Sequence, residues 1–375
     1  MRNLVGKTTQ TVKMSTAATG RSRMRRWFPG TAHPLVVSAP MDFVTNAKLA
    51  SEVSKAQGFG FIQGGRTFKP DSPALAKLEK ELSQAATLLR PSTESKTLPV
   101  GVGFVLYSEC AGTHFGRTTV PLLARFKPAA VWFFAPDPKM PHTLGSVVKD
   151  VRDASSEAWS PRIVVQVGNV GAAREAARLG VDVIVAQGMD AGGHQFAKGA
   201  GIVSLVPEIR DMLDSEFEGV EIAVWAAGGI VDGRGVAAAL ALGAEAAVLG
   251  TRYMVATESD AQDFKRKAIL STVDGGVNTV KSQLHDHVQS NREWPDLYDG
   301  RAVVHPSHRD HEAGVPIDEN EARFKDAKES GDTSRMVTWS GTGVGLVNTE
   351  SPAAEITTTV REEAIRSIKN LQGSS

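Results

Sequence analysis

The chain has 375 residues, enough for one large domain or two, and its 42 basic and 42 acidic residues balance. This balance gives no field that would favour nucleic acid, and no apolar run is long enough to cross a membrane. Cys110 is the only cysteine, which excludes an intrachain disulfide and a thiolate metal cluster and fits a reducing compartment. Composition therefore predicts a soluble globular protein with neither a nucleic-acid nor a membrane partner.

The N-terminus is basic and rich in Ser and Thr, and its first acidic residue is Asp42. Such a segment is typical of a disordered arm, but mitochondrial targeting segments share this composition, and so would a stretch that precedes an alternative start at Met14. A secretory apolar segment is absent, and the last three residues are not a peroxisomal signal. We predict a flexible arm over residues 1–33 and a cytoplasmic location, with a mitochondrial location as the alternative.

From residue 34 onward, short β-branched or aromatic runs alternate with helical patterns. Most of these runs are almost continuously apolar, which is typical of parallel strands covered on both faces. The eight predicted strands are Leu35–Ser38, Phe59–Gln63, Val100–Val105, Ala130–Ala135, Arg162–Val167, Val181–Ala186, Glu221–Ala226 and Ala244–Leu249. Eight βα units with short connections favour an α/β fold, a TIM (β/α)8 barrel over residues 34–260, with an open doubly wound sheet as the alternative.

Glycines mark the ends of three predicted helices, where a left-handed residue is wanted. These helices are Asn46–Gln57, Gly171–Leu179 and Asp232–Leu242, followed by Gly58, Gly180 and Gly243. Beyond the barrel, residues 261–350 have few strand runs and many turn residues, and we interpret them as an inserted smaller segment that shapes the substrate pocket. Residues 351–375 are predicted to form a closing helix that covers the eighth strand.

The most informative loop follows the sixth strand and reads Gln187-Gly188-Met189-Asp190-Ala191-Gly192-Gly193-His194. The active site of a TIM barrel lies at the carboxyl ends of its strands. Glycines allow the backbone to approach a ligand closely, and the loop presents one imidazole. A core or surface histidine is the alternative, but a core residue would not normally follow two glycines at this end of a strand. We therefore predict that His194 is catalytic.

Glycines also follow the seventh and eighth strands, as Gly228-Gly229 and as Leu249-Gly250-Thr251. Loops at these two positions, backed by the helix that begins near Asp232, are suited to a phosphate monoester. Tight turns without a ligand are the alternative. At the first strand, Ala39-Pro40-Met41 places a rigid turn and a polarizable side chain at the barrel mouth, where a flat ring system would fit. Gln166 either points into the barrel as a hydrogen-bonding group or is an ordinary buried glutamine.

Three histidines, His305, His308 and His311, are spaced three residues apart, but we predict no metal site. His-Glu-x-x-His is absent and Pro306 disrupts a helical arrangement of the three side chains. A nucleophile elbow and a Walker A motif are also absent, which excludes a serine hydrolase and a P-loop NTPase.

Taken in order, these motifs resemble the nitronate monooxygenases, formerly called 2-nitropropane dioxygenases. The resemblance extends over about residues 35–350, because Tyr298-Asp299-Gly300-Arg301, the stretch 309–314 and the stretch 341–346 also look like the fungal branch. It implies a TIM barrel with non-covalent FMN. It also implies oxidation of alkyl nitronates, such as propionate 3-nitronate, by dioxygen to a carbonyl compound and nitrite.

The resemblance also implies roles for individual residues. His194 matches the active-site histidine, which would hydrogen-bond or orient a nitronate and would take the α-proton of a neutral nitroalkane. The residues implied to bind the cofactor are Ala39, Pro40, Met41, Gln187, Gly192, Gly193, Gly228, Gly229, Val248, Leu249, Gly250 and Thr251. Asp190 and Phe196 depart from the usual glutamate and glycine, and Gly103 stands where many relatives carry an asparagine, which predicts a roomier pocket.

Two other functions stay open at this stage. An NAD(P)H-dependent flavin enoyl-acyl-carrier-protein reductase shares the barrel, FMN and the glycine-rich histidine loop. A non-catalytic ligand-binding barrel is the alternative outside the enzymes, although the retention of His194 and both phosphate loops argues against it.

Overall fold

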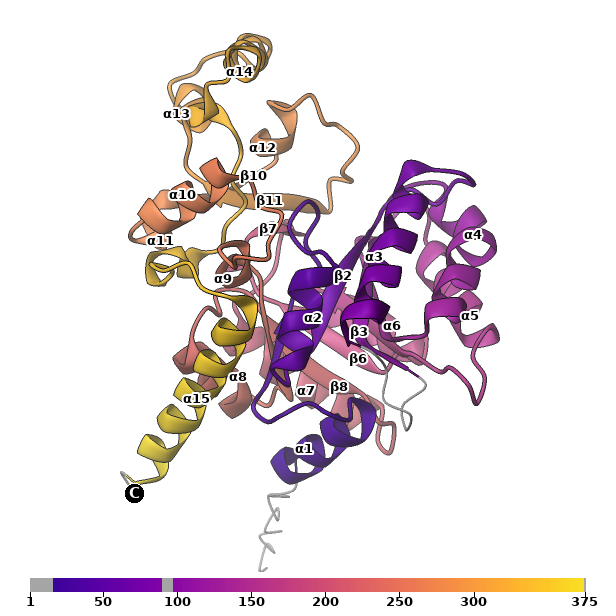
Figure 1. The fold of residues 1–375 in the computed structure, drawn as a ribbon. Helices are drawn as coiled ribbons and strands as arrows, with labels where there is room; N and C mark the ends of the chain where they lie inside the picture. The colour runs from indigo at the N-terminus through magenta and orange to yellow at the C-terminus, as the bar shows by residue number, and fades with distance from the viewer. Residues whose placement is uncertain (1–15, 90–96, 374–375) are drawn as a thin grey trace, which may run out of the picture.

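The computed structural model describes residues 16–89 and 97–373, and its centre is a parallel sheet of eight strands (Figure 1). The strands are β1 (Leu35–Ser38), β2 (Gly60–Gly65), β3 (Leu98–Val105), β4 (Pro128–Phe134), β5 (Arg162–Val167), β6 (Val183–Gln187), β8 (Ala223–Ala227) and β9 (Ala246–Leu249). Their order is β1-β9-β8-β6-β5-β4-β3-β2, and a backbone bridge between Val37 and Phe59 joins the two end strands. The predicted TIM barrel is confirmed, and the open sheet is excluded.

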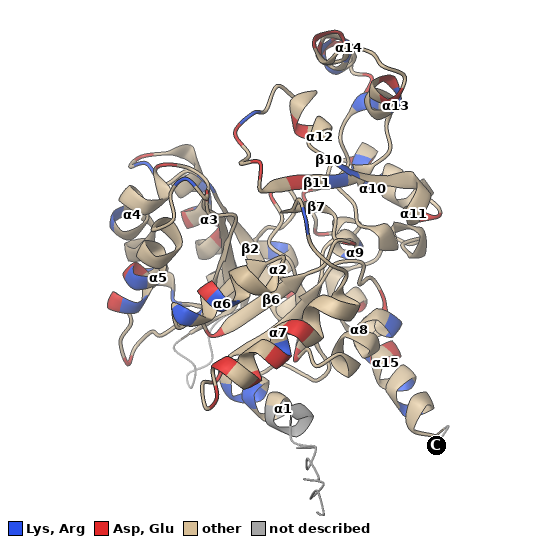
Figure 2. Ribbon diagram, turned by 180° about the vertical axis from the view of Figure 1, so that it is seen from behind, with Lys and Arg blue, Asp and Glu red and all other residues tan. Residues whose placement is uncertain are grey.

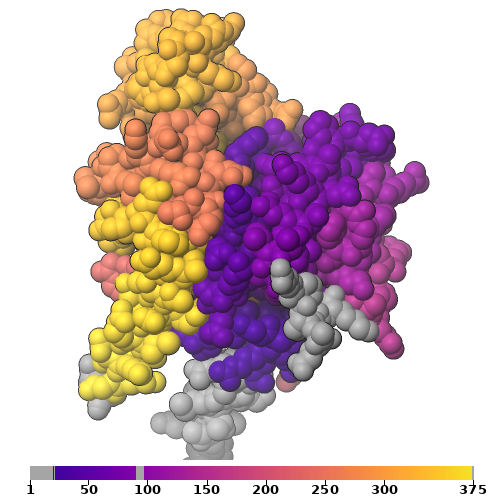
Figure 3. Space-filling model, in the orientation of Figure 1, coloured from indigo at the N-terminus to yellow at the C-terminus, as the bar shows by residue number. Residues whose placement is uncertain are grey.

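Helices surround the barrel, as expected when parallel strands are joined by right-handed crossovers. They are α2 (Ala47–Lys55), α3 (Pro73–Leu89), α4 (Ala111–Phe126), α5 (Thr143–Asp153), α6 (Val170–Arg178), α7 (Ile202–Glu216), α8 (Gly233–Ala241) and α15 (Ala353–Gln372). The closing helix α15 packs against α8, α2 and β1 and so completes the ring beside the first strand. In Figure 3 the yellow α15 lies directly beside indigo residues of the N-terminal half.

The three glycines predicted to end helices are required for two different reasons, backbone conformation at two of them and space at the third. Gly180 and Gly243 have φ of 70° and 102°, the left-handed region in which glycine is favoured. After α2 the left-handed residue is instead Gln57, with φ of 60°. Gly58 is needed for space, because a Cβ there would lie 2.8 Å from Cγ2 of Thr357 on α15.

Alternate residues of each strand bury in two separate layers, as the period of a strand requires. In β8, Trp225 and Ala227 point into the barrel, whereas Val224 and Ala226 pack against the surrounding helices. Large aromatic side chains fill the barrel interior, and the rings of Trp225 and Trp132 lie 6.5 Å apart. The barrel is therefore a packed core at its amino end and leaves space for a ligand only at the carboxyl end.

Helix α1 (Thr16–Trp27) covers the amino end of the barrel, opposite the 261–350 segment (Figure 1). Met24, Trp27 and Phe28 are buried against the starts of the strands, and Arg23 forms a 2.7 Å ion pair with Glu245. From residue 16 onward this arrangement differs from the flexible arm expected over residues 1–33, because the apolar residues of this stretch bury in the barrel floor. Residues 1–15, which also belong to the proposed targeting segment, lie outside the described residues.

The 261–350 segment covers the carboxyl end of the barrel (Figure 1). It contains α10 (Asp263–Ser271), α11 (Gly275–Asn278), β10 (Thr279–Ser282), α12 (Leu284–His287), β11 (Tyr298–Val303), α13 (Pro306–Glu312), α14 (Ile317–Ser330), η1 (Thr333–Arg335) and η2 (Thr342–Leu346). Its strand β11 pairs antiparallel with β10 on one side and with β7 (Gly193–Phe196) on the other, in the order β10-β11-β7. Gly193 and His194 therefore belong to a strand and not to the predicted loop. The domain boundaries at 260 and 350 stay predictions.

In the view of Figure 2, acidic and basic residues are interspersed along the helices. Among residues 16–89 and 97–373, every helix is too short or too polar to cross a bilayer.

Candidate active site

A cavity of about 640 Å³ opens at the carboxyl ends of the barrel strands and is roofed by the 261–350 segment. All the residues that sequence analysis assigned to the site line this cavity, with one exception. They are His194 together with Ala39, Pro40, Met41, Gln187, Gly192, Gly193, Gly228, Gly229, Val248, Gly250 and Thr251. The structure therefore brings together strand ends that are more than 200 residues apart in the sequence.

Leu249 is the exception. Its neighbour Val248 points into the barrel, so alternation along β9 turns the side chain of Leu249 outward into the core between sheet and helices. Leu249 contributes its backbone instead, because its carbonyl oxygen accepts a 3.0 Å hydrogen bond from the amide of Ala39. Any contact of Leu249 with the cofactor would therefore be made by its backbone, and its assignment to the cofactor site stays a prediction.

The loop after β6 is held by a hydrogen bond between its own residues and by contacts with the 261–350 segment. Gln187 Nε2 donates to the carbonyl oxygen of His194 (3.1 Å), while Gln187 Oε1 is buried without a hydrogen-bond partner. Gly192 is required for a close approach, because a Cβ there would lie 2.5 Å from the backbone nitrogen of Gly341. Asp190 faces the same returning chain and accepts a 3.0 Å hydrogen bond from the hydroxyl of Thr342. Asp190, which stands where relatives usually carry a glutamate, therefore contacts the 261–350 segment that roofs the cavity.

The glycines after β8 have the left-handed backbone expected of a tight turn, with φ of 110° at Gly228 and 72° at Gly229. The helix that was expected to back them, α8, has its first amides already engaged. Asp232 accepts from two of them, and Glu363 on α15 accepts from the amide of Gly233 (3.1 Å). A phosphate would therefore meet the turn after β9, where helix α9 (Thr251–Met254) begins, rather than α8.

At the first strand, the Ala39-Pro40-Met41 turn packs against the third. A Cβ on Gly103 would lie 2.4 Å from Cβ and Cγ of Pro40, so the proline ring occupies the space into which a larger side chain would project. The roomier pocket expected from Gly103 is therefore not present at this point. Met41 stays half-buried at the cavity wall.

His194 is held by two residues of the roof, and sequence analysis identified neither of them. Its Nε2 lies 3.0 and 2.9 Å from the two carboxylate oxygens of Asp286 on α12. Its ring stacks on the indole of Trp294, with centroids 3.6 Å apart and planes 9° from parallel. The imidazole is therefore fixed in both position and plane. Trp339 packs against the same ring, with centroids 4.7 Å apart.

The cavity floor carries a polar group from β5. Gln166 lines the cavity, and its Oε1 accepts a 3.2 Å hydrogen bond from Nε1 of Trp132 on β4. Of the two possibilities left open for Gln166, the structure shows a side chain that faces the barrel interior and is partly engaged.

A group of buried histidines lies behind Trp339. His285 and His305 approach to 3.0 Å between Nδ1 and Nε2, and His308 packs over His285. Burial lowers the pKa of His285 to about 4 and that of His305 to about 3. His311 is exposed and does not join them. Within the described part of the chain, no set of three or more His, Cys, Asp or Glu side chains is arranged to hold a metal ion.

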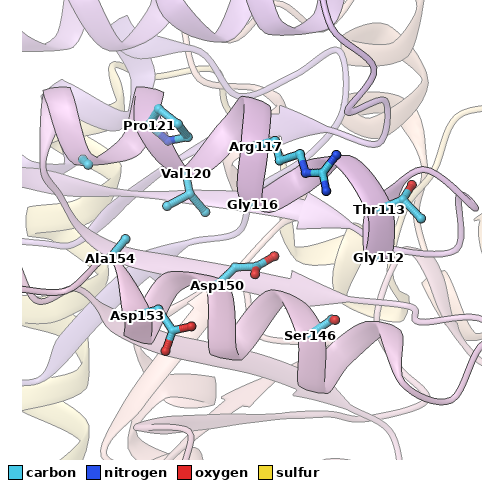
Figure 4. A pocket seen from close by; sticks show the side chains of 11 residues that line it. Gly112, Thr113, Gly116, Arg117, Val120, Pro121, Ser146, Asp150, Asp153 and Ala154 are labelled. Atoms are coloured by element: carbon cyan, nitrogen blue, oxygen red, sulfur yellow. The ribbon is translucent and has the colours of Figure 1, made fainter.

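A second hollow, of about 630 Å³, lies on the outside of the barrel between α4 and α5 (Figure 4). Gly116 lets the two helices approach, because a Cβ there would lie 2.5 Å from Oδ2 of Asp150. This hollow contains none of the strand-end residues, so it is separate from the candidate active site.

The residues that line the cavity have the features that a flavin would require. An isoalloxazine ring presents donors and acceptors at its edge and needs a flat apolar wall, and a phosphate needs backbone donors. The unpartnered Gln187 Oε1, the Pro40-Met41 wall and the glycine turns after β8 and β9 provide these features.

Comparisons with known proteins agree with this geometry. A family model described as nitronate monooxygenase matches residues 148–363. The nitronate monooxygenase of Neurospora crassa is 49% identical over 96% of this chain and 97% of that protein. The nitronate monooxygenase npaC of Metarhizium robertsii is 36% identical over 92% of this chain and 94% of its own. Among solved structures, FabK from Thermotoga maritima has a TM-score of 0.69 at 25% identity, over 94% of this chain and 99% of that chain.

The family model covers more than half of the chain, and both fungal relatives align over nearly its whole length. The chain therefore belongs to the nitronate monooxygenase family.

Proposed function

We propose that this oxidoreductase uses FMN and dioxygen to convert alkyl nitronates, such as propionate 3-nitronate, into carbonyl compounds and nitrite. The observation that carries the proposal is the imidazole of His194, which lines the cavity while Asp286 and Trp294 fix it. Family membership supports the reaction class, and the shape of the cavity supports a flat cofactor beside a small substrate.

Particular residues would hold the cofactor. Gln187 would meet the polar edge of the ring, Met41 would lie against its face, and the backbone at Gly229, Gly250 and Thr251 would meet the phosphate. FMN, when bound, supplies a two-electron acceptor that dioxygen can reoxidise. The protein supplies placement and charge.

The Asp286 contact assigns a role to each nitrogen of His194. A carboxylate only accepts hydrogen bonds, so Nε2 carries the proton in this contact, and Nδ1 is the atom left to act on a substrate. A nitronate is already an anion, so no proton has to be removed from it. Nδ1 can donate a hydrogen bond to the nitronate only when the ring is an imidazolium, which the Asp286 carboxylate would stabilise. With a neutral nitroalkane, Nδ1 would take the α-proton, and Asp286 would stabilise the resulting imidazolium.

The decisive experiment is an absorption spectrum of the purified protein, followed by anaerobic titration with propyl-1-nitronate and then with NADH. We expect a flavin spectrum that bleaches with nitronate and not with NADH, and nitrite release once air is admitted. Rapid bleaching by NADH alone would favour the enoyl-acyl-carrier-protein reductase. Failure to release FMN from the denatured protein would favour the non-catalytic barrel.

A further inference from the structure

Two cationic side chains, Arg66 and Lys265, line the cavity in the described structure, apart from the imidazole. Lys265 lies in the field of the Asp42 carboxylate, and burial lowers its pKa. Arg66 follows β2 directly, after Gly65 turns the chain with φ of 87°. The proposed reaction of His194 uses neither cation, so each needs a separate explanation.

Arg66 has only weak partners. Its guanidinium lies 3.6 Å from Oε2 of Glu293, longer than a hydrogen bond, and the two side chains are 42% and 65% exposed. Its other neighbours are the ring of Tyr107, whose centroid lies 5.8 Å away, and the carboxylate of Asp42, whose pKa is raised by burial and lowered by the charge of Arg66. An exposed pair of this kind contributes little to stability, so a better anion can displace Glu293 from Arg66. A guanidinium binds a carboxylate through two parallel hydrogen bonds, which suits it to such an exchange.

The roof links Arg66 to the proposed reaction centre. Glu293, which approaches Arg66, immediately precedes Trp294, which stacks on His194. Strands β2 and β6 stand four places apart in the eight-stranded sheet, so their ends face each other across the mouth. A ligand held at His194 can therefore extend toward a positive group on the opposite wall of the same cavity.

We propose that Arg66 is an anion subsite that recognises a carboxylate on the substrate tail, distal to the carbon that is oxidised. This inference rests on the proposed function, because it assumes a nitronate beside His194. It makes a carboxylate-bearing nitronate a better substrate than an alkyl nitronate of equal length. A phosphate of the cofactor has similar anionic chemistry, so the test separates the two sources.

The test compares propionate 3-nitronate with propyl-1-nitronate on the FMN-loaded enzyme. In Arg66→Met we expect kcat/KM for the carboxylate substrate to fall about 30-fold or more, mainly through KM, with less than about a 3-fold change for the alkyl substrate. Glu293→Gln keeps an acceptor for the Tyr107 hydroxyl but removes the competing charge, so it should raise kcat/KM for the carboxylate substrate only. Lys77→Met is the matched control, because Lys77 is an exposed cation that does not line the cavity.

Binding without turnover gives the second measurement. Succinate has a carboxylate in place of the nitronate group and keeps the tail carboxylate, whereas butyrate lacks the tail charge. Succinate should inhibit propyl-1-nitronate oxidation more strongly than butyrate, and Arg66→Met should abolish that difference. Equal losses of kcat/KM on both substrates would overturn the inference. Loss of FMN from Arg66→Met would also overturn it, because that result would assign Arg66 to the cofactor phosphate. If the wild type oxidises no nitronate, the proposed function fails instead, and a succinate-induced thermal shift that depends on Arg66 would still support the subsite.

Discussion

The barrel mouth and the roof formed by the 261–350 segment contribute to the cavity in different ways. The barrel contributes glycine turns and strand ends, such as Gly192 and Gly229, whose positions follow from the repeat of the fold. The roof contributes Asp286 and Trp294, which contact His194 across about a hundred residues of sequence. In the proposed function the barrel turns hold the cofactor, whereas the roof fixes His194, the side chain proposed to act at the carbon that is oxidised.

Of the changes considered, removal of the His194 imidazole should lower turnover the most. His194→Asn should retain FMN, because the cofactor contacts come from the barrel, but should lower kcat on nitronate by about 10³-fold. Flavin content and steady-state nitrite release measure the two effects separately. Unchanged turnover on a preformed nitronate would remove His194 from the mechanism.

Acid should act on the roof before it acts on the barrel. The folded-state pKa of His285, about 4, lies below the unfolded value of 6.5, so the unfolded chain binds more protons between these pH values. The stabilisation from neutral His285 is thus present above pH 6.5 and is lost as the pH falls toward 4, by about 3 kcal/mol in all.

Burial of His285 lowers its pKa, and the neighbouring His308 and His194 lower it further. The hydrogen bond to the carbonyl oxygen of Val280 and the carboxylate of Asp286 raise it. Hydrogen exchange at falling pH should show residues 279–303 opening before the barrel strands. His285→Gln should flatten this pH dependence. Simultaneous opening of barrel and roof would contradict a separate acid-sensitive unit.

The barrel could be predicted from the sequence, whereas the contacts of the roof could not. Each of the eight barrel strands lies within two residues of its predicted bounds at both ends, because buried parallel strands leave continuous apolar runs. Strand β7 escaped prediction, since its four residues include two polar side chains and its partner, β11, begins more than 100 residues later. Asp286 had no local signal, because a carboxylate on a four-residue helix resembles any solvated turn.

Loss of the roof carboxylate should have a smaller effect than loss of the imidazole itself. Asp286→Asn keeps the size of the side chain but removes the charge that holds Nε2 of His194, and a hydrogen bond to a charged group corresponds to about 10- to 100-fold in rate. We expect kcat to fall by that factor with FMN content unchanged, and Asp286→Glu to restore part of it. Asp332→Asn, at an exposed cap elsewhere in the roof, is the control. Equal losses in both Asn variants would indicate a general structural effect.

The smallest expected effect lies where barrel and roof meet. In Gly192→Ala the new methyl group would lie 2.5 Å from the Gly341 amide nitrogen, so the Ser340-Gly341 backbone must move away, at a cost of about 1–3 kcal/mol. That amide donates to the hydroxyl of Thr251 (3.0 Å), so the shift should also disturb the turn after β9 and weaken FMN binding. Gly145→Ala, inside α5 and 3.4 Å from Leu179, should be neutral or slightly stabilising. Thermal unfolding and FMN titration measure both variants, and equal FMN affinity in Gly192→Ala and the wild type would show that the roof can shift without reaching the phosphate turn.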